Sequence, residues 1–146
     1  MTQRMILIST NHPNLRFSSR DVFHTLQIVY RGEKKVIPAL AVICTHSRFI
    51  RKINREFLKH DYVTDVIAFP LGDEGGVEGE IYINLDAAKK QAREYGVTFT
   101  QEARRLLIHG ALHLLGYEDA TKNEKKKMSM REEIYLELMN MKIRQQ

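Results

Sequence analysis

The sequence predicts an α/β (α+β) fold: a single domain spanning residues 1–146, with a four-stranded mixed sheet and about five helices packed on it. A chain of 146 residues suits one domain with its own hydrophobic core. Its 43% hydrophobic and 28% charged residues are ordinary for a globular protein. Short β-branched runs alternate with longer stretches of helical periodicity in the order β-α-β-α-β-β-α-α-α, which is typical of helices packed on a sheet.

The first three elements are predicted to be a strand, a helix and a second strand. Residues 5–9 are short, apolar and partly β-branched, which favours a first or edge strand. Ser18 or Ser19 is expected to cap a helix that runs to about Tyr30, because its apolar residues are spaced for one face. Residues 39–45 follow a proline and are predicted to form the second strand.

A short basic helix is predicted next, capped by Ser47 and running through about Phe57. Its apolar side chains are expected to face the core: Phe49, Ile50, Ile53 and Phe57. Its basic side chains are expected to face outward: Arg48, Arg51, Lys52 and Arg55. This basic face is either a solvated helix surface or a site of contact with RNA phosphates.

The middle of the chain predicts a third strand at residues 64–69 and a fourth at residues 80–84. Between them, residues 72–79 are acidic and rich in glycine, which predicts a flexible loop. Asp86 is expected to open a helix that ends at Gly96.

Two further helices complete the predicted fold. The first is expected to open at Thr100 and to close at Gly116. The second is expected to open at Thr121 or Asn123 and to run to about Met139.

Charge and cysteine content indicate the setting of the protein. The net charge of +5 and the pI near 9.4 favour a polyanionic partner. The single cysteine, Cys44, excludes an internal disulfide and lies in an apolar run, which predicts a buried, unreactive thiol in a reducing cytosol. No apolar run is long enough to span a membrane, and the N-terminal one is too short for a secretory signal, so a cytoplasmic location is expected.

Residues 109–119, HGALHLLGYED, carry the main chemical signal. His109 and His113 are four residues apart, so on a helix their side chains share one face and can bind one divalent ion. Gly116 is placed to end that helix in a left-handed conformation, which lets the chain turn back and bring Asp119 to the same ion. Two nitrogens and one carboxylate oxygen leave a fourth position open, as in a catalytic zinc site. We therefore predict one Zn²⁺ per chain, although this ligand set also accepts other divalent transition metals.

Three other interpretations of this stretch remain open. The two histidines could be satisfied core residues of a buried helix. Asp119 could cap the final helix instead of binding an ion. The spacing is also that of the metzincin proteases, so the chain could be a metallopeptidase, although Gly110 stands where such a protease has its general-base glutamate.

The same stretch is similar to the signature HGxLHLxGYDH of the YbeY family, bacterial metal-dependent endoribonucleases. Residues 54–70 resemble the family's N-x-x-(F/Y)-R-x-K-D-x-P-T-(D/N)-V-L-S-F-P, and residues 79–86 resemble its G-D-I-x-I-S-x-(D/E). Residues 123–138 resemble its acidic C-terminal helix. The resemblance implies the same fold and a single-strand-specific endoribonuclease of ribosomal RNA maturation and ribosome quality control. It also implies the small ribosomal subunit as a partner and no small-molecule cofactor.

The chain departs from the family pattern at functional positions. The family's third ligand is commonly histidine, and here it is Asp119. The family's arginine falls on Leu58, and its lysine falls on His60. The lost arginine leaves a further alternative, a non-catalytic RNA- or ribosome-binding protein with a structural metal.

The neighbouring residues are the candidates for contacts with RNA. Phosphate contacts are expected from Arg51, Arg55 and Lys59. His60 could transfer a proton, because imidazole titrates near neutrality, or could be a loop histidine without a role. Thr64 is expected to orient this loop through local backbone bonds and to lie against the substrate. The sequence makes no prediction of oligomeric state.

Overall fold

The computed structural model of the protein describes residues 5–72 and 75–144. Its elements follow the predicted order, with one additional π-helical turn, η1. They are β1 (Ile6–Thr10), α1 (Ser19–Gly32), β2 (Leu40–Thr45), α2 (Ser47–Ile53), η1 (Asn54–Leu58), β3 (Val66–Pro70), β4 (Gly79–Asn84), α3 (Leu85–Tyr95), α4 (Phe99–Leu114) and α5 (Lys122–Arg144). The described part of the chain thus confirms a four-stranded mixed sheet and five α-helices.

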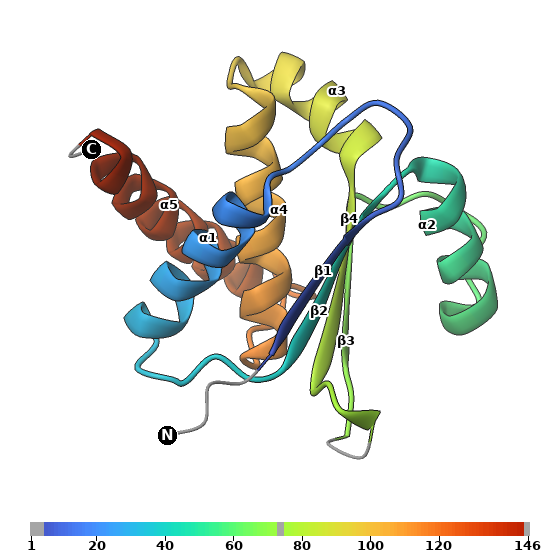
Figure 1. The fold of residues 1–146 in the computed structure, drawn as a ribbon, viewed down its shortest axis with the longest axis horizontal. Coiled ribbons are helices and arrows are strands. Elements are labelled where there is room, and N and C mark those ends of the chain that lie inside the picture. The colour runs from blue at the N-terminus through green and yellow to red at the C-terminus, as the bar shows by residue number, and fades with distance from the viewer. Residues whose placement is uncertain (1–4, 73–74, 145–146) are drawn as a thin grey trace.

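The strands lie in the order β1-β2-β4-β3 (Figure 1). The pairs β1–β2 and β2–β4 are parallel, and β3–β4 is antiparallel. The predicted edge position of β1 is therefore confirmed. In this register, Ile83 of β4 lies between Cys44 of β2 and Val66 of β3.

The two faces of the sheet pack against different helices. Ile81 and Ile83 of β4 join the main core, which α1 and α4 cover (Figure 1). Tyr82, between them, points to the other face and packs with the smaller cluster under α2. This alternation follows from the two-residue period of a strand. Helix α5 packs on α1 and α4, on the side away from the sheet.

The basic helix differs from its prediction at both ends. His46, not Ser47, is its N-cap, because the Nδ1 atom of His46 accepts a hydrogen bond from the backbone N–H of Phe49 at 3.2 Å. After Ile53 the backbone continues as a π-helix, in which each turn contains more residues than in an α-helix. The expected inward position of Phe57 is therefore wrong, and its side chain is 65% exposed.

Helix α4 also begins earlier than expected. Thr98 is its N-cap: its hydroxyl accepts from the N–H of Gln101, whose side chain accepts in return from the N–H of Thr98. Thr100 lies inside the helix, so the predicted opening at Thr100 is one residue later than the observed start at Phe99.

Cys44 is buried, as predicted, and burial raises the pKa of its thiol to about 11. Within the predicted flexible loop at residues 72–79, residues 73–74 lie outside the described part of the chain. Among the described residues, no helix combines the length and apolar character that crossing a membrane requires.

Candidate metal centre

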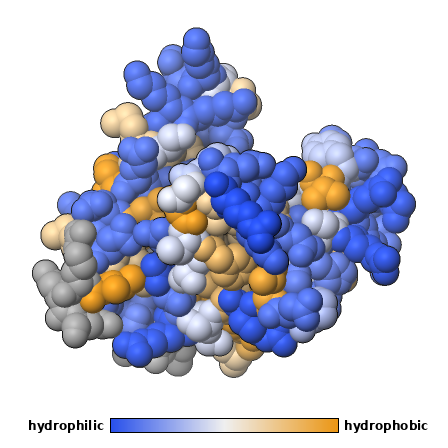
Figure 2. Space-filling view, turned by 90° about the horizontal axis from the view of Figure 1, so that it is seen from above, coloured by the Kyte–Doolittle hydropathy of each residue, from blue (hydrophilic) through white to orange (hydrophobic). Residues whose placement is uncertain are grey.

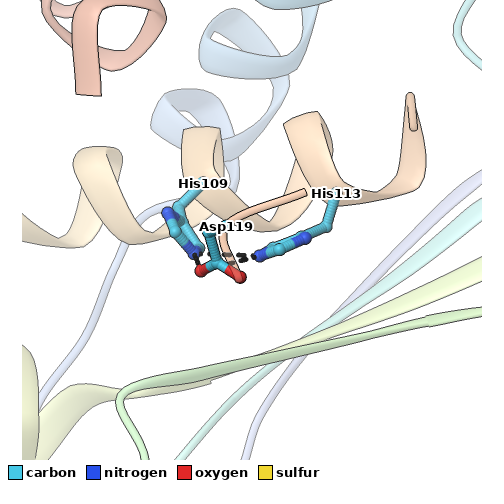
Figure 3. Close-up of side chains that lie close together, drawn as sticks. All are labelled: His109, His113 and Asp119. Carbon is cyan, nitrogen blue, oxygen red and sulfur yellow. Dashed lines mark hydrogen bonds and ion pairs between the residues drawn. The ribbon is translucent and has the colours of Figure 1, made fainter. Parts of the chain in front are cut away.

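The side chains of His109, His113 and Asp119 converge on one point beneath α4 (Figure 3). The Nε2 atoms of the two histidines are 3.1 Å apart, and Oδ2 of Asp119 lies 3.3 Å and 3.4 Å from them. Ligands placed about 2.0–2.1 Å from a tetrahedral zinc ion are roughly 3.3 Å from one another. In the described part of the chain, this is the one group of three metal-ligating side chains whose atoms all lie within 4.8 Å.

Helix α4 presents the two histidines from adjacent turns, as the four-residue spacing predicts. Gly110, between them, lies against the sheet. A Cβ atom at this position would be 2.7 Å from Cγ2 of Ile81 and 3.3 Å from Cγ2 of Val66. The glycine therefore lets α4 lie close to β3 and β4, and it leaves no room for the glutamate of a metzincin protease.

The turn after α4 returns the chain to the histidines. The N–H of Gly116 donates to His113 O, and the N–H of Tyr117 donates to Leu112 O, both at 3.0 Å. This is a Schellman turn, and Gly116 has the predicted positive φ of 105°. The next residues carry Asp119 beneath α4.

The cap of α5 is Thr121, not Asp119. The hydroxyl of Thr121 accepts from the N–H of Glu124 at 3.1 Å, and Glu124 Oε1 accepts from the N–H of Thr121 at 2.8 Å. The structure therefore contradicts the capping role for Asp119 and leaves its carboxylate beside the imidazoles.

The half-buried carboxylate of Glu33 anchors the turn that carries Asp119. The hydroxyl of Tyr117 donates to one oxygen of Glu33 at 2.8 Å. The hydroxyl of Tyr135, on α5, donates to the other oxygen. Glu33 thereby ties the end of α1 to the turn and to α5.

Glu132 of α5 holds the ring of His109 from behind. Its Oε2 atom lies 2.6 Å from Nδ1 of His109. A carboxylate at this distance keeps a proton on Nδ1 of His109. The lone pair of Nε2 is then directed at the point on which His113 and Asp119 also converge. Sequence reasoning did not single out Glu132, although the spacing of the acidic C-terminal helix contains a glutamate there.

Glu132 belongs to a buried chain of charges. Nη1 of Arg105 lies 3.2 Å from Glu132, and the same guanidinium donates to both oxygens of Glu102 at 2.6 Å and 2.8 Å. Gln91 donates to Glu102 at 2.6 Å. The carboxylates of Glu102 and Glu132 outnumber the single guanidinium of Arg105, so an excess negative charge lies behind His109. This charge favours a cation bound between His109, His113 and Asp119.

The pKa of His109 reflects these neighbours. Burial has the largest single effect and lowers the pKa. The hydrogen bond and charge of Glu132, with the charges of Asp119 and Asp65, together raise it above the ordinary value.

The predicted RNA-binding cations lie elsewhere, on α2, η1 and the residue that follows (Figure 1). Arg51 forms an exposed ion pair with Asp61, with Nε and Oδ1 2.8 Å apart. Arg55 is exposed. Lys59 is also exposed and ends η1 in a left-handed conformation, with φ of 57°. These residues do not join the three-residue ligand group.

His60 and Thr64 are also outside the ligand group. The ring of His60 packs on Tyr62, with centroids 5.0 Å apart. Thr64 accepts a hydrogen bond from Nδ2 of Asn54 at 3.3 Å. Thr64 also lines a cavity of about 420 Å³ together with Asp65, whose charge acts on His109.

Comparison with known proteins finds one matching family and several similar proteins. The family model described as "Endoribonuclease YbeY" matches residues 7–140. "Endoribonuclease YbeY" of Chlorobaculum parvum is 45% identical over 112 residues, which is 77% of this chain and 79% of that protein. "Endoribonuclease YbeY" of Chlorobium chlorochromatii is 35% identical over 135 residues, covering 92% and 86% of the two chains.

A solved structure has a similar fold. It is the solution structure of TM1509 from Thermotoga maritima, which superimposes with a TM-score of 0.63 at 31% identity. The match covers 91% of this chain and 87% of the other.

Proposed function

The chain belongs to the YbeY family of endoribonucleases, and on this premise we propose that it cleaves single-stranded RNA at the centre formed by His109, His113 and Asp119. The observation that carries the proposal is the convergence of their three ligand atoms, no more than 3.4 Å apart. These residues would hold one divalent transition metal. Zinc is our first choice, because two imidazoles and one carboxylate leave the open position of a catalytic zinc site.

The chain's own residues have defined roles in this proposal. When bound, the ion supplies Lewis acidity, which polarises a phosphoryl oxygen and acidifies a water molecule. Glu132 orients His109 and keeps the proton on Nδ1. Asp119 neutralises one charge of the ion, so that about one positive charge remains to attract the anionic substrate.

Residues of α2, of η1 and of the loop that follows η1 have supporting roles in the proposal. Arg55 and Lys59 contact phosphates, and Thr64 lies against the substrate at the cavity beside Asp65. Arg51 contributes phosphate contacts only when it leaves Asp61. His60 transfers protons to or from the substrate.

The proposed substrate is ribosomal RNA, and the proposed partner is the small ribosomal subunit. The names of the relatives support an RNA substrate. The net charge of +5 favours association with polyanionic particles such as ribosomes. We accordingly place the activity in the cytoplasm, in ribosomal RNA maturation and ribosome quality control.

The two alternative functions are less well supported. A metallopeptidase needs a general base at position 110, and the packing of Gly110 on Ile81 leaves no space for one. A non-catalytic RNA-binding protein would explain the leucine at position 58, but it gives no reason for an open ligand position.

Metal content and RNA cleavage, measured together, test the proposal. The purified protein should contain about one divalent transition metal per chain and cleave a single-stranded RNA, and EDTA should abolish cleavage. His113→Ala should lose both metal and cleavage. Full metal content and cleavage in this variant, or hydrolysis of a peptide and not of RNA, would overturn the proposal.

Two substitutions at position 119 test the third ligand. Asp119→Asn removes the anionic oxygen and should lose metal and activity together. Asp119→His restores a nitrogen ligand and should retain metal. If Asp119→Asn keeps both metal and activity, Asp119 is not a ligand.

A further inference from the structure

We propose that Phe57 and Tyr62 form a stacking surface for the bases of single-stranded RNA. The proposal rests on the proposed function for its substrate class. It assigns base recognition to a part of the chain for which the sequence predicted phosphate contacts and a proton-transfer role for His60. Its occupant is single-stranded RNA.

The first observation is the exposure of two aromatic rings close together in the chain. Phe57 is 65% exposed and Tyr62 is 52% exposed. Aromatic side chains bury large areas in cores and interfaces, so their exposure leaves a large favourable contact unmade. An exposed ring offers a face on which any base can stack.

The second observation is that each of these rings packs against another ring. Phe57 contacts Phe69 edge to face, with centroids 6.3 Å apart, and Phe69 contacts Tyr82 in the same way at 5.9 Å. The ring of Tyr62 packs on His60 at 5.0 Å. Rings already ordered lose little conformational freedom when a base stacks on them.

The backbone of residues 51–62, the segment that carries both rings, is also constrained. The π-helical turn η1 brings Phe57 out of the core, and Lys59 ends it in a left-handed conformation. The ion pair between Arg51 and Asp61 ties the following loop to α2. Nδ2 of Asn54 donates to the backbone carbonyl of Tyr62 at 2.9 Å and fixes the loop from beneath.

The third observation is charge. Lys52, Arg55 and Lys59 are exposed on the same segment. Figure 2, in which this part of the chain forms the lobe at the right, shows that lobe as mainly hydrophilic with one hydrophobic patch on the face in view. Cations that follow a phosphate backbone, with aromatic rings between them, are typical of surfaces that bind single-stranded nucleic acid. This charge favours RNA over an apolar segment of another protein.

The position of the segment connects it with the metal centre. Val63, Thr64 and Asp65 continue directly from Tyr62 and line the cavity of about 420 Å³. The charge of Asp65 acts on His109. A strand stacked on Tyr62 would therefore continue into this cavity, which Val63, Thr64 and Asp65 line.

Fluorescence gives a direct test, because the chain contains no tryptophan. Tyr62→Trp places a single indole in the proposed surface. Its emission should be quenched by a single-stranded 12-nucleotide RNA, and much less by an abasic oligonucleotide of the same length. Tyr95→Trp is the matched control, since Tyr95 is 59% exposed but lies at the end of α3. EDTA keeps the RNA intact, so the result does not depend on metal chemistry.

Affinity gives an independent measurement. Phe57→Leu and Tyr62→Leu should each weaken binding of the 12-nucleotide RNA about tenfold and leave binding of the abasic oligonucleotide unchanged. Tyr62→Phe keeps the ring and should bind as the wild type does, and Tyr95→Leu should have no effect. Thermal melting of each variant establishes that it is folded.

The outcomes separate this proposal from the proposed function. Equal quenching at positions 62 and 95, or equal loss of affinity for both oligonucleotides in the leucine variants, would overturn the stacking surface. Loss of cleavage in His113→Ala does not bear on it. Conversely, RNA stacking without any metal-dependent cleavage would leave the surface in place and overturn the proposed enzyme.

Discussion

Among single residues, Glu132 has the largest expected effect on the metal centre without being a ligand. Glu132→Gln keeps the shape of the side chain but removes the charge that holds the Nδ1 proton of His109. Loss of such a carboxylate partner lowers metal affinity by roughly 10- to 100-fold. Zinc titration against a competing chelator measures this loss.

The neighbouring glutamate provides the control for this substitution. Glu133 lies beside Glu132 in the sequence, but its side chain is exposed. Glu133→Gln removes the same charge from α5 and should leave zinc affinity unchanged. Equal affinity losses in the two variants would mean that the general charge of α5, and not the contact with His109, controls binding.

Cys44 is expected to be chemically inert in the folded protein. Burial raises the pKa of its thiol to about 11, so very little reactive thiolate is present at pH 8. Iodoacetamide at pH 8 should modify the native protein far more slowly than the protein unfolded in guanidinium chloride. Equal rates, measured by mass spectrometry, would show that the thiol is accessible.

The convergence of the three candidate ligands could be predicted from the sequence, but the residues that support them could not. His109, His113 and Asp119 lie within eleven consecutive residues, so helix periodicity and one glycine turn are enough to bring them together. Glu132 and Arg105 meet His109 only because α5 packs on α4. Contacts of that kind depend on tertiary structure, which local patterns do not contain.

Among the elements, the start of α4 supplies a test of helix capping. Thr98→Ala removes the side-chain acceptor for the N–H of Gln101 and should lower the free energy of unfolding by about 1 kcal/mol. Thr100→Ala, two residues later, removes no cap and should change it little. Urea denaturation of the two variants measures both values, and a larger loss for Thr100→Ala would contradict the observed cap.

The positions of the helices and strands could be predicted more accurately than the residues at which they begin and end. Apolar periodicity places a helix or strand to within a few residues, because burial of one face stabilises the whole element. Thr98 and Thr100 have similar intrinsic preferences for a cap position, and the reciprocal hydrogen bonds between Thr98 and Gln101 favour Thr98. The π-helical turn had no signal in the periodicity, and for that reason Phe57 was assigned to the wrong face.

At the scale of the whole molecule, metal binding is expected to stabilise the fold. Zinc bound only by the folded chain adds about 2.7 kcal/mol at a free concentration of 100 times Kd. EDTA should therefore lower the melting temperature of the wild type in scanning calorimetry. His113→Ala should melt at the same temperature with and without EDTA. If EDTA lowered the melting temperature of both proteins equally, the stabilising ion would be bound at another site.

The class and element order of the fold were predicted, but the order of the strands was not. Alternating strands and helices indicate parallel pairing with helices on the faces. Nothing local requires β4 to pair between β2 and β3. That arrangement depends on fitting α4 over β3 and β4, which Gly110 permits.

The central position of α4 affects how the protein is made. The ribosome releases the four strands before it releases Phe99–Leu114, yet Val42, Ile81 and Ile83 of the sheet are fully buried in the finished protein. A nascent chain that lacks α4 therefore presents uncovered apolar strands, which are prone to aggregation and are recognised by chaperones. The protease resistance of the nascent chain should rise abruptly only when α4 has left the ribosomal exit tunnel.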